Sequence, residues 1–562
     1  MALLECVPNF SEGRNPEVIR QIAESIERVD GVFLLDVDPG KATNRTVMTF
    51  AGPPEAVVEA AFQAIKTAAA LIDMAAHQGE HPRMGATDVC PLIPIEGLSL
   101  EEAAEWARRL GERVGRELNI PVFLYEYAAT TPERQNLATI RSGEYEGLAA
   151  KLKDPSWAPD FGAAEFNERS GATVIGARDF LVAYNVNLNT TSTRRANAVA
   201  FDVREQGRIL REGDPVTGAI AHDEHGDPVR IPGTCKSVKA IGWYIEEYGI
   251  AQVSMNLTNL SDTSLHEAFE ACCVSANNRG MRVTGSELVG MIPLRALLDA
   301  GKYFLRKQQR SVGVSEEEII RIAVRSLGLD ELSPFDPRKK ILEYRLEDLR
   351  GEKKLIDLTL RHFADETASE SVAPGGGSVA AYAGALGASL GVMVANLSSH
   401  RRGWDDRWEA FSQWAEQGAG IKSQLLLLVD EDTKAFMGIL DAFRLPKSAP
   451  EELAARKEAI QAATRRAIEV PAQTMELAYS ALDLLEAMVR EGNPNSVSDA
   501  GVGALCVRAA VHGAWLNVQT NTGGLKDAEF VRQVSERGQF LTHRTEERVA
   551  ALIRLVEEKI RG

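Results

Sequence analysis

The stretch that decides the fold of the N-terminal half is residues 3–38, LLECVPNFSEGRNPEVIRQIAESIERVDGVFLLDVD. Its apolar residues alternate, then recur with helical spacing, then alternate again, which predicts a strand, a helix and a strand. Continuing outward, the order becomes β-α-β-β-α-β, with one additional helix that the capping box of Ser99 and Glu102 begins. The predicted strands are 3–10, 32–38, 45–51 and 120–127, and the predicted helices are 16–28, 54–72 and 99–119.

The same order of elements occurs a second time without visible sequence repetition. A β-α-β-β-α-β unit forms an antiparallel sheet with helices on one face, the ferredoxin-like arrangement. Two such units side by side leave a cleft, where we expect a ligand. The predicted strands of this second unit are 173–188, 235–245, 251–257 and 281–287, and its predicted helices are 193–206 and 264–278.

The pattern changes after a charged, proline-bearing segment that is typical of a domain boundary. From about Leu355 the sequence shows long helical periodicities rich in Ala and Leu, which predict an all-α bundle of five or six helices. The predicted fold class is therefore an α+β N-terminal half of two ferredoxin-like β-α-β-β-α-β subdomains, followed by an all-α helical-bundle domain. The predicted boundaries are 1–172 and 173–333 for the two subdomains, 334–352 for a linker, and 353–562 for the helical domain.

Composition excludes several classes of protein. With 562 residues, 44% of them hydrophobic, the chain has the composition of a folded multi-domain protein and not of a disordered one. A net charge of -17 argues against binding along a nucleic-acid backbone. The six cysteines are scattered, without CxxC spacing, which favours a reducing, cytoplasmic setting. Residues 379–397 approach membrane-spanning length but are mostly Ala, Gly and Ser, so we predict helix packing and no membrane.

The densest polar cluster is HQGEHPRMG, residues 77–85. Two imidazoles, a carboxylate and a guanidinium could act as a general acid/base beside a clamp for a substrate carboxylate. A zinc site is the weaker reading, because HExxH is not matched and Gly79 and Pro82 would break the helix that such a site needs. A solvated loop is the plain alternative.

Other polar groups leave two readings open. Asp36 and Asp38 end an apolar strand and could point into the cleft near Arg45, or could form an ordinary turn. The irregular run from Trp157 to Ala172 fits a loop over a flat ring, although an interdomain linker is the safer reading.

The helical half carries two further motifs. Residues 373–378, APGGGS, lead into a helix whose free backbone N–H groups could bind an anion, but Ser378 as a simple N-cap is an equal alternative. No lysine follows, so this is not a nucleotide-binding P-loop. Residues 428–432, LVDED, place carboxylates on an otherwise apolar helix, which indicates either a site or a helix edge.

These motifs resemble a known family. The N-terminal 330 residues or so resemble glutamate formimidoyltransferase, and the remainder resembles formimidoyltetrahydrofolate cyclodeaminase, so the whole chain is similar to the bifunctional formimidoyltransferase-cyclodeaminases. The runs that carry the resemblance are VPNFSEG (7–13), HQGEHPRMGATDVCPLIP (77–94), WAPDFG (157–162), REQGR (204–208), IGWYIEE (241–247), APGGGSVAA (373–381), LVDEDTKAF (428–436) and RLPK (444–447).

The resemblance implies two reactions. The formimino group of N-formimino-L-glutamate passes to nitrogen 5 of tetrahydrofolate, and nitrogen 10 then closes on that carbon as ammonia leaves, giving 5,10-methenyltetrahydrofolate. Tetrahydrofolate, in its polyglutamate form, is a co-substrate, and no metal is needed. The family's catalytic residues fall on His81 for the transferase and on Asp432 for the cyclodeaminase, with Asp430 as a candidate supporting carboxylate.

The residues and the resemblance together suggest binding residues and an assembly. Asp38, Arg45 and Arg83 are the candidates for binding formiminoglutamate. A homo-oligomer is expected, and the alternative function is a transferase whose helical domain is only a folate-binding or oligomerisation scaffold. The candidates for folate binding are Gly162, Ala163, Ala164, Glu165, Phe166, Asn167, Glu168, Arg169, Ser170, Gly171, Pro232, Ser286, Glu287, Gly375, Gly376 and Gly377.

Overall fold

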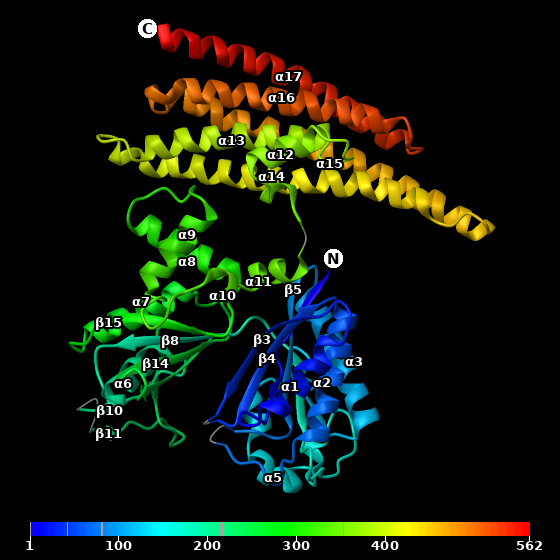
Figure 1. The fold of residues 1–562 in the computed structure, drawn as a ribbon. Coiled ribbons are helices and arrows are strands. Elements are labelled where there is room, and N and C mark those ends of the chain that lie inside the picture. Colours follow the sequence, from blue (N-terminus) through cyan, green and yellow to red (C-terminus); the bar gives the residue numbers. More distant parts are fainter. Residues whose placement is uncertain (1, 42, 80–81, 214–217, 352, 562) are drawn as a thin grey trace. The chain divides into compact units, whose positions relative to one another are not determined.

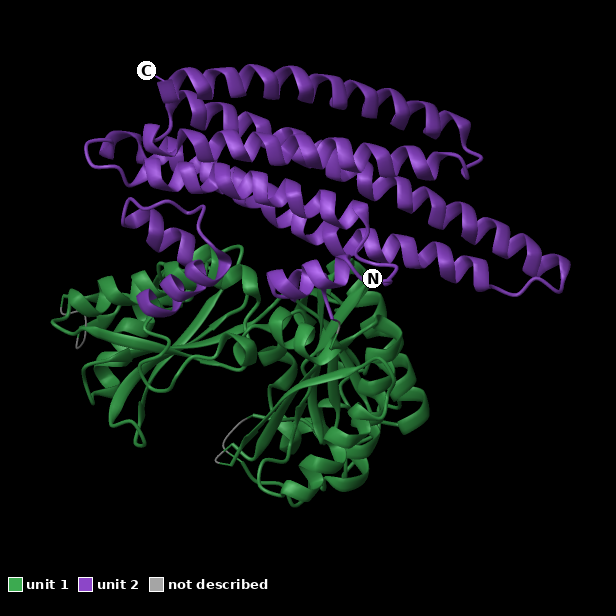
Figure 2. Cartoon of the chain, turned by 45° about the horizontal axis from the view of Figure 1, so that its top comes forward, with its two compact units in different colours: residues 1–300, 327–351 green, residues 301–326, 352–562 purple. Residues whose placement is uncertain are grey.

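The structure is a computed structural model, and the chain divides into two compact units (Figure 2). Unit 1 holds residues 1–300 and 327–351, and unit 2 holds residues 301–326 and 352–562. The residues that the structure describes are 2–41, 43–79, 82–213, 218–351 and 353–561.

The first half of unit 1 is built on a seven-stranded sheet in the order β3-β4-β1/β2-β5-β7-β6 (Figure 1). Its strand pairs are antiparallel, except that β7 runs parallel to both β5 and β6. The strands are β1 (Leu3–Cys6), β2 (Asn9–Phe10), β3 (Phe33–Gly40), β4 (Arg45–Gly52), β5 (Thr87–Glu96), β6 (Val122–Glu126) and β7 (Thr173–Ala177).

Three helices cover one face of this sheet, namely α1 (Pro16–Glu27), α2 (Pro54–Leu71) and α3 (Leu100–Leu118). Every second strand side chain, such as Leu4, Phe50 and Leu92, packs into the core under these helices. The predicted capping box of Ser99 and Glu102 begins α3. The alternate strand side chains face the other way, and that face carries the site described below.

The fourth strand of the predicted β-α-β-β-α-β order is wrong. β5 takes this place beside β1, whereas residues 120–127 form β6 at the far edge of the sheet. β5 escapes prediction because it contains Pro91 and Pro94, and a proline cannot donate a hydrogen bond to a neighbouring strand. The segment α3–β6 and strand β7 then extend the sheet beyond β5.

The second half of unit 1 has a four-stranded antiparallel sheet in the order β13-β14-β8-β15, with α6 and α7 packed against it. The predicted element order is present here, but predicted strand 173–188 is two strands, because β7 belongs to the first sheet and only β8 to the second. The predicted break between residues 172 and 173 therefore lies one strand too early. The elements are β8 (Val182–Leu188), α6 (Thr193–Val203), β13 (Val238–Ile245), β14 (Ile250–Leu257), α7 (Leu265–Asn277) and β15 (Val283–Val289).

Residues 334–352, predicted as a linker, contain two helices of unit 1. Leu342 and Leu346 are buried against Leu3 and Leu35, so the charged sequence conceals an apolar face. These helices and the smaller elements of unit 1 are η1 (Pro132–Arg134), α4 (Leu137–Arg141), α5 (Glu144–Lys151), η2 (Pro155–Trp157), β9 (Arg208–Ile209), β10 (Arg211–Glu212), β11 (Ala219–Ile220), β12 (Arg230–Ile231), α10 (Pro337–Lys340) and α11 (Leu342–Arg350).

Unit 2 is helical, as predicted, and five long helices dominate its described residues (Figure 1). Residues 301–326 also belong to it, since Val312 N donates to Ser412 Oγ (3.1 Å) and Asn396 Nδ2 to Gly313 O (2.8 Å). Its elements, with α8 entering from unit 1, are α8 (Leu294–Lys307), α9 (Glu316–Leu327), η3 (Leu355–Asp357), α12 (Leu360–Thr367), α13 (Gly376–Ser399), η4 (Asp405–Arg407), α14 (Trp408–Arg444), α15 (Pro450–Glu491), η5 (Pro494–Ser496), α16 (Val497–Thr522) and α17 (Ala528–Arg561).

Helix α13 is long and apolar enough to span a membrane, and it is the one described helix with that property. Its small residues nevertheless serve helix packing, as the sequence predicts. A side chain on Gly387 would overlap Gly503 O of α16, and one on Gly391 would overlap Leu484 of α15. More than half of its most apolar window is buried inside unit 2.

Candidate active sites

Unit 1 contains a cavity of about 660 Å³ between its two sheets. It is lined by the strand faces that α1–α3 leave uncovered, together with parts of α4 and α11. Its walls combine apolar strand residues with charges of both signs, so it can hold a ligand that carries both. The charged lining residues are Glu5, Asp36, Asp38, Arg45, Arg141, Glu144, Arg178 and Lys239.

The loop predicted as catalytic is anchored at its start by His77. Its Nε2 lies 2.9 Å from Asn44 O, and its Nδ1 accepts a hydrogen bond from Arg83 Nε (3.3 Å). The Asn44 side chain in turn donates to Gln78 O (2.9 Å) and accepts from the Gly13 N–H (3.0 Å). Both ring nitrogens of His77 are thus engaged within the protein. His81, the histidine that the resemblance selects, lies outside the described residues.

The sequence suggested that Arg83 binds a substrate carboxylate, but the structure pairs its guanidinium group with carboxylates of the protein. Its guanidinium donates to both carboxylate oxygens of Glu146 (2.7 and 2.9 Å) and to Glu144 (3.2 Å). Only about 10% of its side chain is exposed. The structure therefore uses Arg83 to fix the loop to α5.

The segment 162–171 lies directly beside this loop at its C-terminal end. Ala86 N donates to Ser170 O (2.9 Å), and Ala172 N donates to Met84 O (3.1 Å). Gly85 makes this approach possible, since a Cβ there would lie only 2.2 Å from Ala172 O. The predicted catalytic loop and the predicted folate segment therefore lie together where the neighbouring strands β5 and β7 begin.

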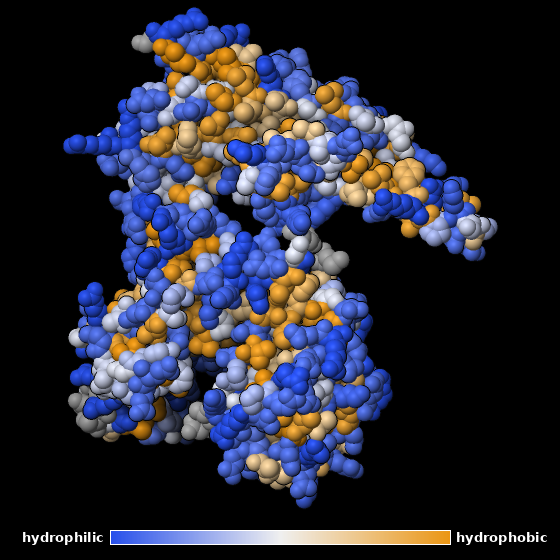
Figure 3. All heavy atoms as spheres, in the orientation of Figure 1, coloured by the Kyte–Doolittle hydropathy of each residue, from blue (hydrophilic) through white to orange (hydrophobic). Residues whose placement is uncertain are grey.

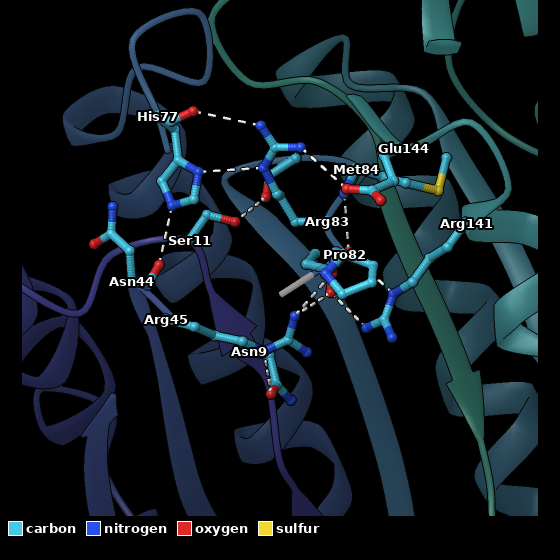
Figure 4. A network of polar contacts seen from close by, with 12 residues as sticks. Asn9, Ser11, Asn44, Arg45, His77, Pro82, Arg83, Met84, Arg141 and Glu144 are labelled. Atoms are coloured by element: carbon cyan, nitrogen blue, oxygen red, sulfur yellow. Dashed lines mark hydrogen bonds and ion pairs between the residues drawn. The ribbon is translucent and has the colours of Figure 1, made fainter. Parts of the chain in front are cut away.

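Asp88 joins the loop to two arginines of the cavity, and the sequence analysis missed it. This fully buried carboxylate accepts from Met84 N (3.0 Å), from Arg45 Nη1 (2.6 Å), and from Nε and Nη2 of Arg141. Figure 4 shows Arg45 and Arg141 approaching each other near Pro82. A signal was present: Asp88 is a lone charge entering an otherwise apolar strand within the motif 77–94.

The carboxyl groups of the cavity have unusual environments. Burial raises the pKa of Glu5 to about 7, although the charge of Arg178 opposes the shift. Burial, and then the neighbouring charge of Asp38, also raise the pKa of Asp36. Both residues line the cavity, as does Asp38, so the sequence reading that pointed Asp36 and Asp38 into a cleft is confirmed.

The candidate site of unit 2 forms where the glycine turn meets α14. Gly377 lies so close to Asp432 that a Cβ would be 2.1 Å from Oδ1. Ser378 Oγ lies 3.2 Å from Asp432 Oδ2 and 2.9 Å from Val429 O. Burial raises the pKa of Asp432, while hydrogen bonds from the Ser378 side chain and backbone lower it. Two motifs fifty residues apart thus make one site, beside a cleft of about 230 Å³.

Asp430 has a different task from Asp432. Its Oδ1 accepts a hydrogen bond from Leu355 N (2.6 Å), so it holds η3 against α14. The cleft is lined instead by Asp432, Gly375–Gly377, Phe436 and Asn517.

None of the thirteen predicted folate residues of unit 1 lines the cavity: residues 162–171 lie beside the loop 77–85, and the other three lie elsewhere. Pro232 lines a separate cleft beside α7. Ser286 Oγ donates to Leu327 O (2.7 Å) under the helices, and Glu287 accepts from Asn185 Nδ2 (3.3 Å) on the opposite face of β15. The described residues include no group of three His, Cys, Asp or Glu side chains that could hold a metal ion.

Comparison with known proteins covers nearly the whole chain. Residues 3–178 match the family model described as "Formiminotransferase domain, N-terminal subdomain", residues 183–347 match "Formiminotransferase domain", and residues 359–539 match "Formiminotransferase-cyclodeaminase". The first two matches meet between β7 and β8, where the structure changes from one sheet to the other.

Three curated relatives are similar to all or part of the chain. A formimidoyltransferase-cyclodeaminase of Mus musculus is 44% identical over 557 residues, which is 99% of either chain. A glutamate formimidoyltransferase of Streptococcus pyogenes serotype M1 is 42% identical over 54% of this chain and 93% of its own. A methenyltetrahydrofolate cyclohydrolase of Methylorubrum extorquens is 37% identical over 31% of this chain and 84% of its own. The two-unit fold, the two candidate sites and the full-length similarity agree: the chain belongs to the formimidoyltransferase-cyclodeaminase family.

Proposed function

We propose that the chain transfers the formimino group of N-formimino-L-glutamate to nitrogen 5 of tetrahydrofolate, and then cyclises the product to 5,10-methenyltetrahydrofolate with release of ammonia. The observation that carries the proposal is the full-length similarity to formimidoyltransferase-cyclodeaminases, combined with one chemically equipped site in each unit. Tetrahydrofolate is the co-substrate of the first step, and its 5-formimino derivative is the substrate of the second; the proposed steps use no metal.

The cavity of unit 1 suits the donor. A formimino group is an amidine, which is protonated near neutral pH, and the rest of formiminoglutamate carries two carboxylates. The cavity offers carboxylates at Asp36 and Asp38 and guanidinium groups at Arg45 and Arg141. Opposite charges can therefore orient the donor. We propose that His81 takes the proton from nitrogen 5 and returns it to the departing amine of glutamate.

The site of unit 2 suits ring closure. Nitrogen 10 forms a bond to the formimino carbon, the bond from that carbon to its terminal nitrogen breaks, and ammonia leaves. A group must take the proton of nitrogen 10 and deliver one to the leaving nitrogen. We propose that Asp432 does both, because burial shifts its pKa upward, toward the pH at which the enzyme works. The Gly375–Gly377 turn lets folate approach this carboxylate closely.

The experiment uses the full chain, tetrahydrofolate and formiminoglutamate, and follows methenyltetrahydrofolate and ammonia in one sample. Wild type should release both in equal amounts. His81→Ala should abolish transfer but still cyclise supplied 5-formiminotetrahydrofolate, whereas Asp432→Asn should transfer without releasing ammonia. Each loss should be on the order of 10²- to 10⁴-fold. If wild type consumes the donor without ammonia, the helical unit is a scaffold and the second activity is refuted.

We further propose that the chain is a cytoplasmic homo-oligomer. Its six cysteines are free thiols, which suits a reducing compartment. Figure 3 shows apolar residues gathered over the helices of unit 2. Leu386 of α13 is 44% exposed and Val502 of α16 is 51% exposed, and these two helices pack closely together at Gly387 and Gly503. A second copy of the chain could cover this surface.

Light scattering tests the assembly. Wild type should have a multiple of the 61.2 kDa chain mass. Leu386→Glu combined with Val502→Glu should reduce that multiple, while Leu453→Glu at the start of α15, 32 residues before the Leu485 that packs against Gly503, should not. A 61.2 kDa wild type would refute the homo-oligomer.

A further inference from the structure

The unit 1 cavity contains a pair of arginines that share one carboxylate. Asp88 is wholly buried, and the side chains of Arg45 and Arg141 are 11% and 14% exposed. Arg45 Nη1 lies 2.6 Å from Asp88 Oδ2, and the same oxygen accepts from Arg141 Nη2. Arg141 Nε completes the arrangement at 3.3 Å from Oδ1. Three segments far apart in sequence, namely β4, β5 and the end of α4, thus meet at one point.

Arg45, Arg141 and Asp88 together bring two positive charges and one negative charge to a site that is largely shielded from water. Two guanidinium ions share one carboxylate, so Asp88 by itself balances one of their two positive charges. Burial lowers the pKa of Arg45, the charge of Asp88 opposes this shift, and the nearby charge of Arg141 adds to it. A ligand anion placed beside the pair would be held by the remaining positive charge.

Arg141 is the member that faces a ligand. Both Arg45 and Arg141 line the cavity. Nε and Nη2 of Arg141 are held by Asp88, while its Nη1 meets no partner within the described parts of the chain. Two fixed nitrogens leave the third in a defined position, which is the preorganised geometry that carboxylate recognition by arginine requires.

We propose that Arg141, together with Arg45, binds a carboxylate of the formimino donor, and that Asp88 is the positioning residue that holds both guanidinium groups for it. This inference rests on the proposed transferase function and names its carboxylate-binding pair. It also explains why the carboxylate of Asp88 contacts Met84 N: one residue ties the donor's anion site to the loop predicted as catalytic.

The test compares Arg141→Met with wild type on three donors. These are N-formimino-L-glutamate, N-formimino-L-glutamine, which lacks the side-chain charge, and 4-formiminoaminobutyrate, which lacks the α-carboxylate. In wild type, the donor that lacks the bound carboxylate should have a kcat/KM lower by roughly 10- to 100-fold. In Arg141→Met that difference should fall to within about threefold, with the KM for tetrahydrofolate unchanged. Arg141→Lys should retain part of it.

Matched controls separate recognition from folding. Arg134 is as buried as Arg141 and is paired with Asp160 (2.7 Å), but it does not line the cavity. Arg134→Met and Asp160→Asn should leave the donor difference intact, whereas Asp88→Asn should shrink it. Thermal unfolding of each variant checks that it is folded. An equal drop for all three donors in Arg141→Met, or an unchanged difference, would overturn the proposal.

A second readout does not depend on turnover. Calorimetric titration with L-glutamate should give a Kd that Arg141→Met weakens roughly 10-fold or more and that Arg134→Met leaves alone. Wild type that transfers nothing but binds glutamate through Arg141 would refute the proposed function and keep this site. Glutamate binding that is insensitive to Arg141 would refute the site.

Discussion

The two units build their candidate sites from opposite materials. In unit 1, polar side chains from strands, loops and a short helix converge on a cavity of about 660 Å³, and buried ion pairs hold them in place. In unit 2, helices pack through glycine and alanine, and one carboxylate sits against a backbone turn beside a cleft of about 230 Å³. The functional side chains are positioned by ion pairs in the first site and by steric fit in the second.

Gly377→Ala should have the largest effect, because no space remains for a side chain between Gly377 and Asp432. Its methyl group would displace Asp432, and cyclodeamination should fall on the order of a thousandfold while formimino transfer continues. The two steps are assayed separately with supplied intermediate. Gly438→Ala on the same helix as Asp432 has open space around it and should match wild type. If Gly377→Ala released ammonia at the wild-type rate, the claim that steric fit positions Asp432 would be refuted.

Unit 1 also depends on steric fit at Gly85, and Gly85→Ala should disrupt that fit. Its Cβ would overlap the carbonyl oxygens of both Ala172 and Ser170, so we expect unit 1 to lose more than about 3 kcal/mol of stability, and transfer with it. Urea titration monitored by circular dichroism measures the loss. Gly147→Ala, in α5 with nothing nearby, is the matched control. Equal stabilities of the two variants would contradict the close approach at residue 85.

Glu5→Gln sharpens the role of charge in unit 1. A carboxyl whose pKa is about 7 in the folded state, against 4.5 in the unfolded chain, binds more protons when folded. Its contribution to stability is therefore present below pH 4.5 and is lost as the pH rises through 7, by roughly 3 kcal/mol. Glu5→Gln should remove this fall from the unit 1 transition, whereas Glu27→Gln on exposed α1 should keep it. A pH dependence identical to wild type would be the contrary result.

Ser378→Ala should have the smallest effect and tests charge in the unit governed by steric fit. Losing the Ser378 hydrogen bond removes an influence that lowers the pKa of Asp432. The acid limb of cyclodeamination should then move to higher pH by less than about one unit, and the transfer profile should stay fixed. A shift toward lower pH would reverse the assigned role of Ser378.

The sequence predicts regular helices well, but it predicts poorly which distant residues come together in the fold. The helical unit follows from periodicity, since five long helices repeat one pattern. Strand β5 was missed because its prolines contradict a central strand, and residues 334–352 were misread because charges flank Leu342 and Leu346, which are buried.

Site residues divide in the same way. Asp432 and Gly377 were each visible as local motifs, but only the packing of α13 against α14 shows that they touch. Arg141 gave no local signal, because its meaning comes from Asp88, 53 residues earlier. The sequence suggests that Arg83 binds substrate, because its partners Glu144 and Glu146 lie some sixty residues later in the chain.

The interleaving of the chain between the two units limits how the enzyme can be taken apart. Residues 301–326 belong to unit 2 although unit 1 resumes at residue 327, so the backbone passes from one unit to the other at three places and not at one. A single cut near residue 350 would leave the transferase fragment carrying Val312 and Gly313 without Ser412 and Ala415. Anyone who wishes to express the two activities as separate polypeptides must therefore redesign the excised surface, or keep residues 301–326 with both.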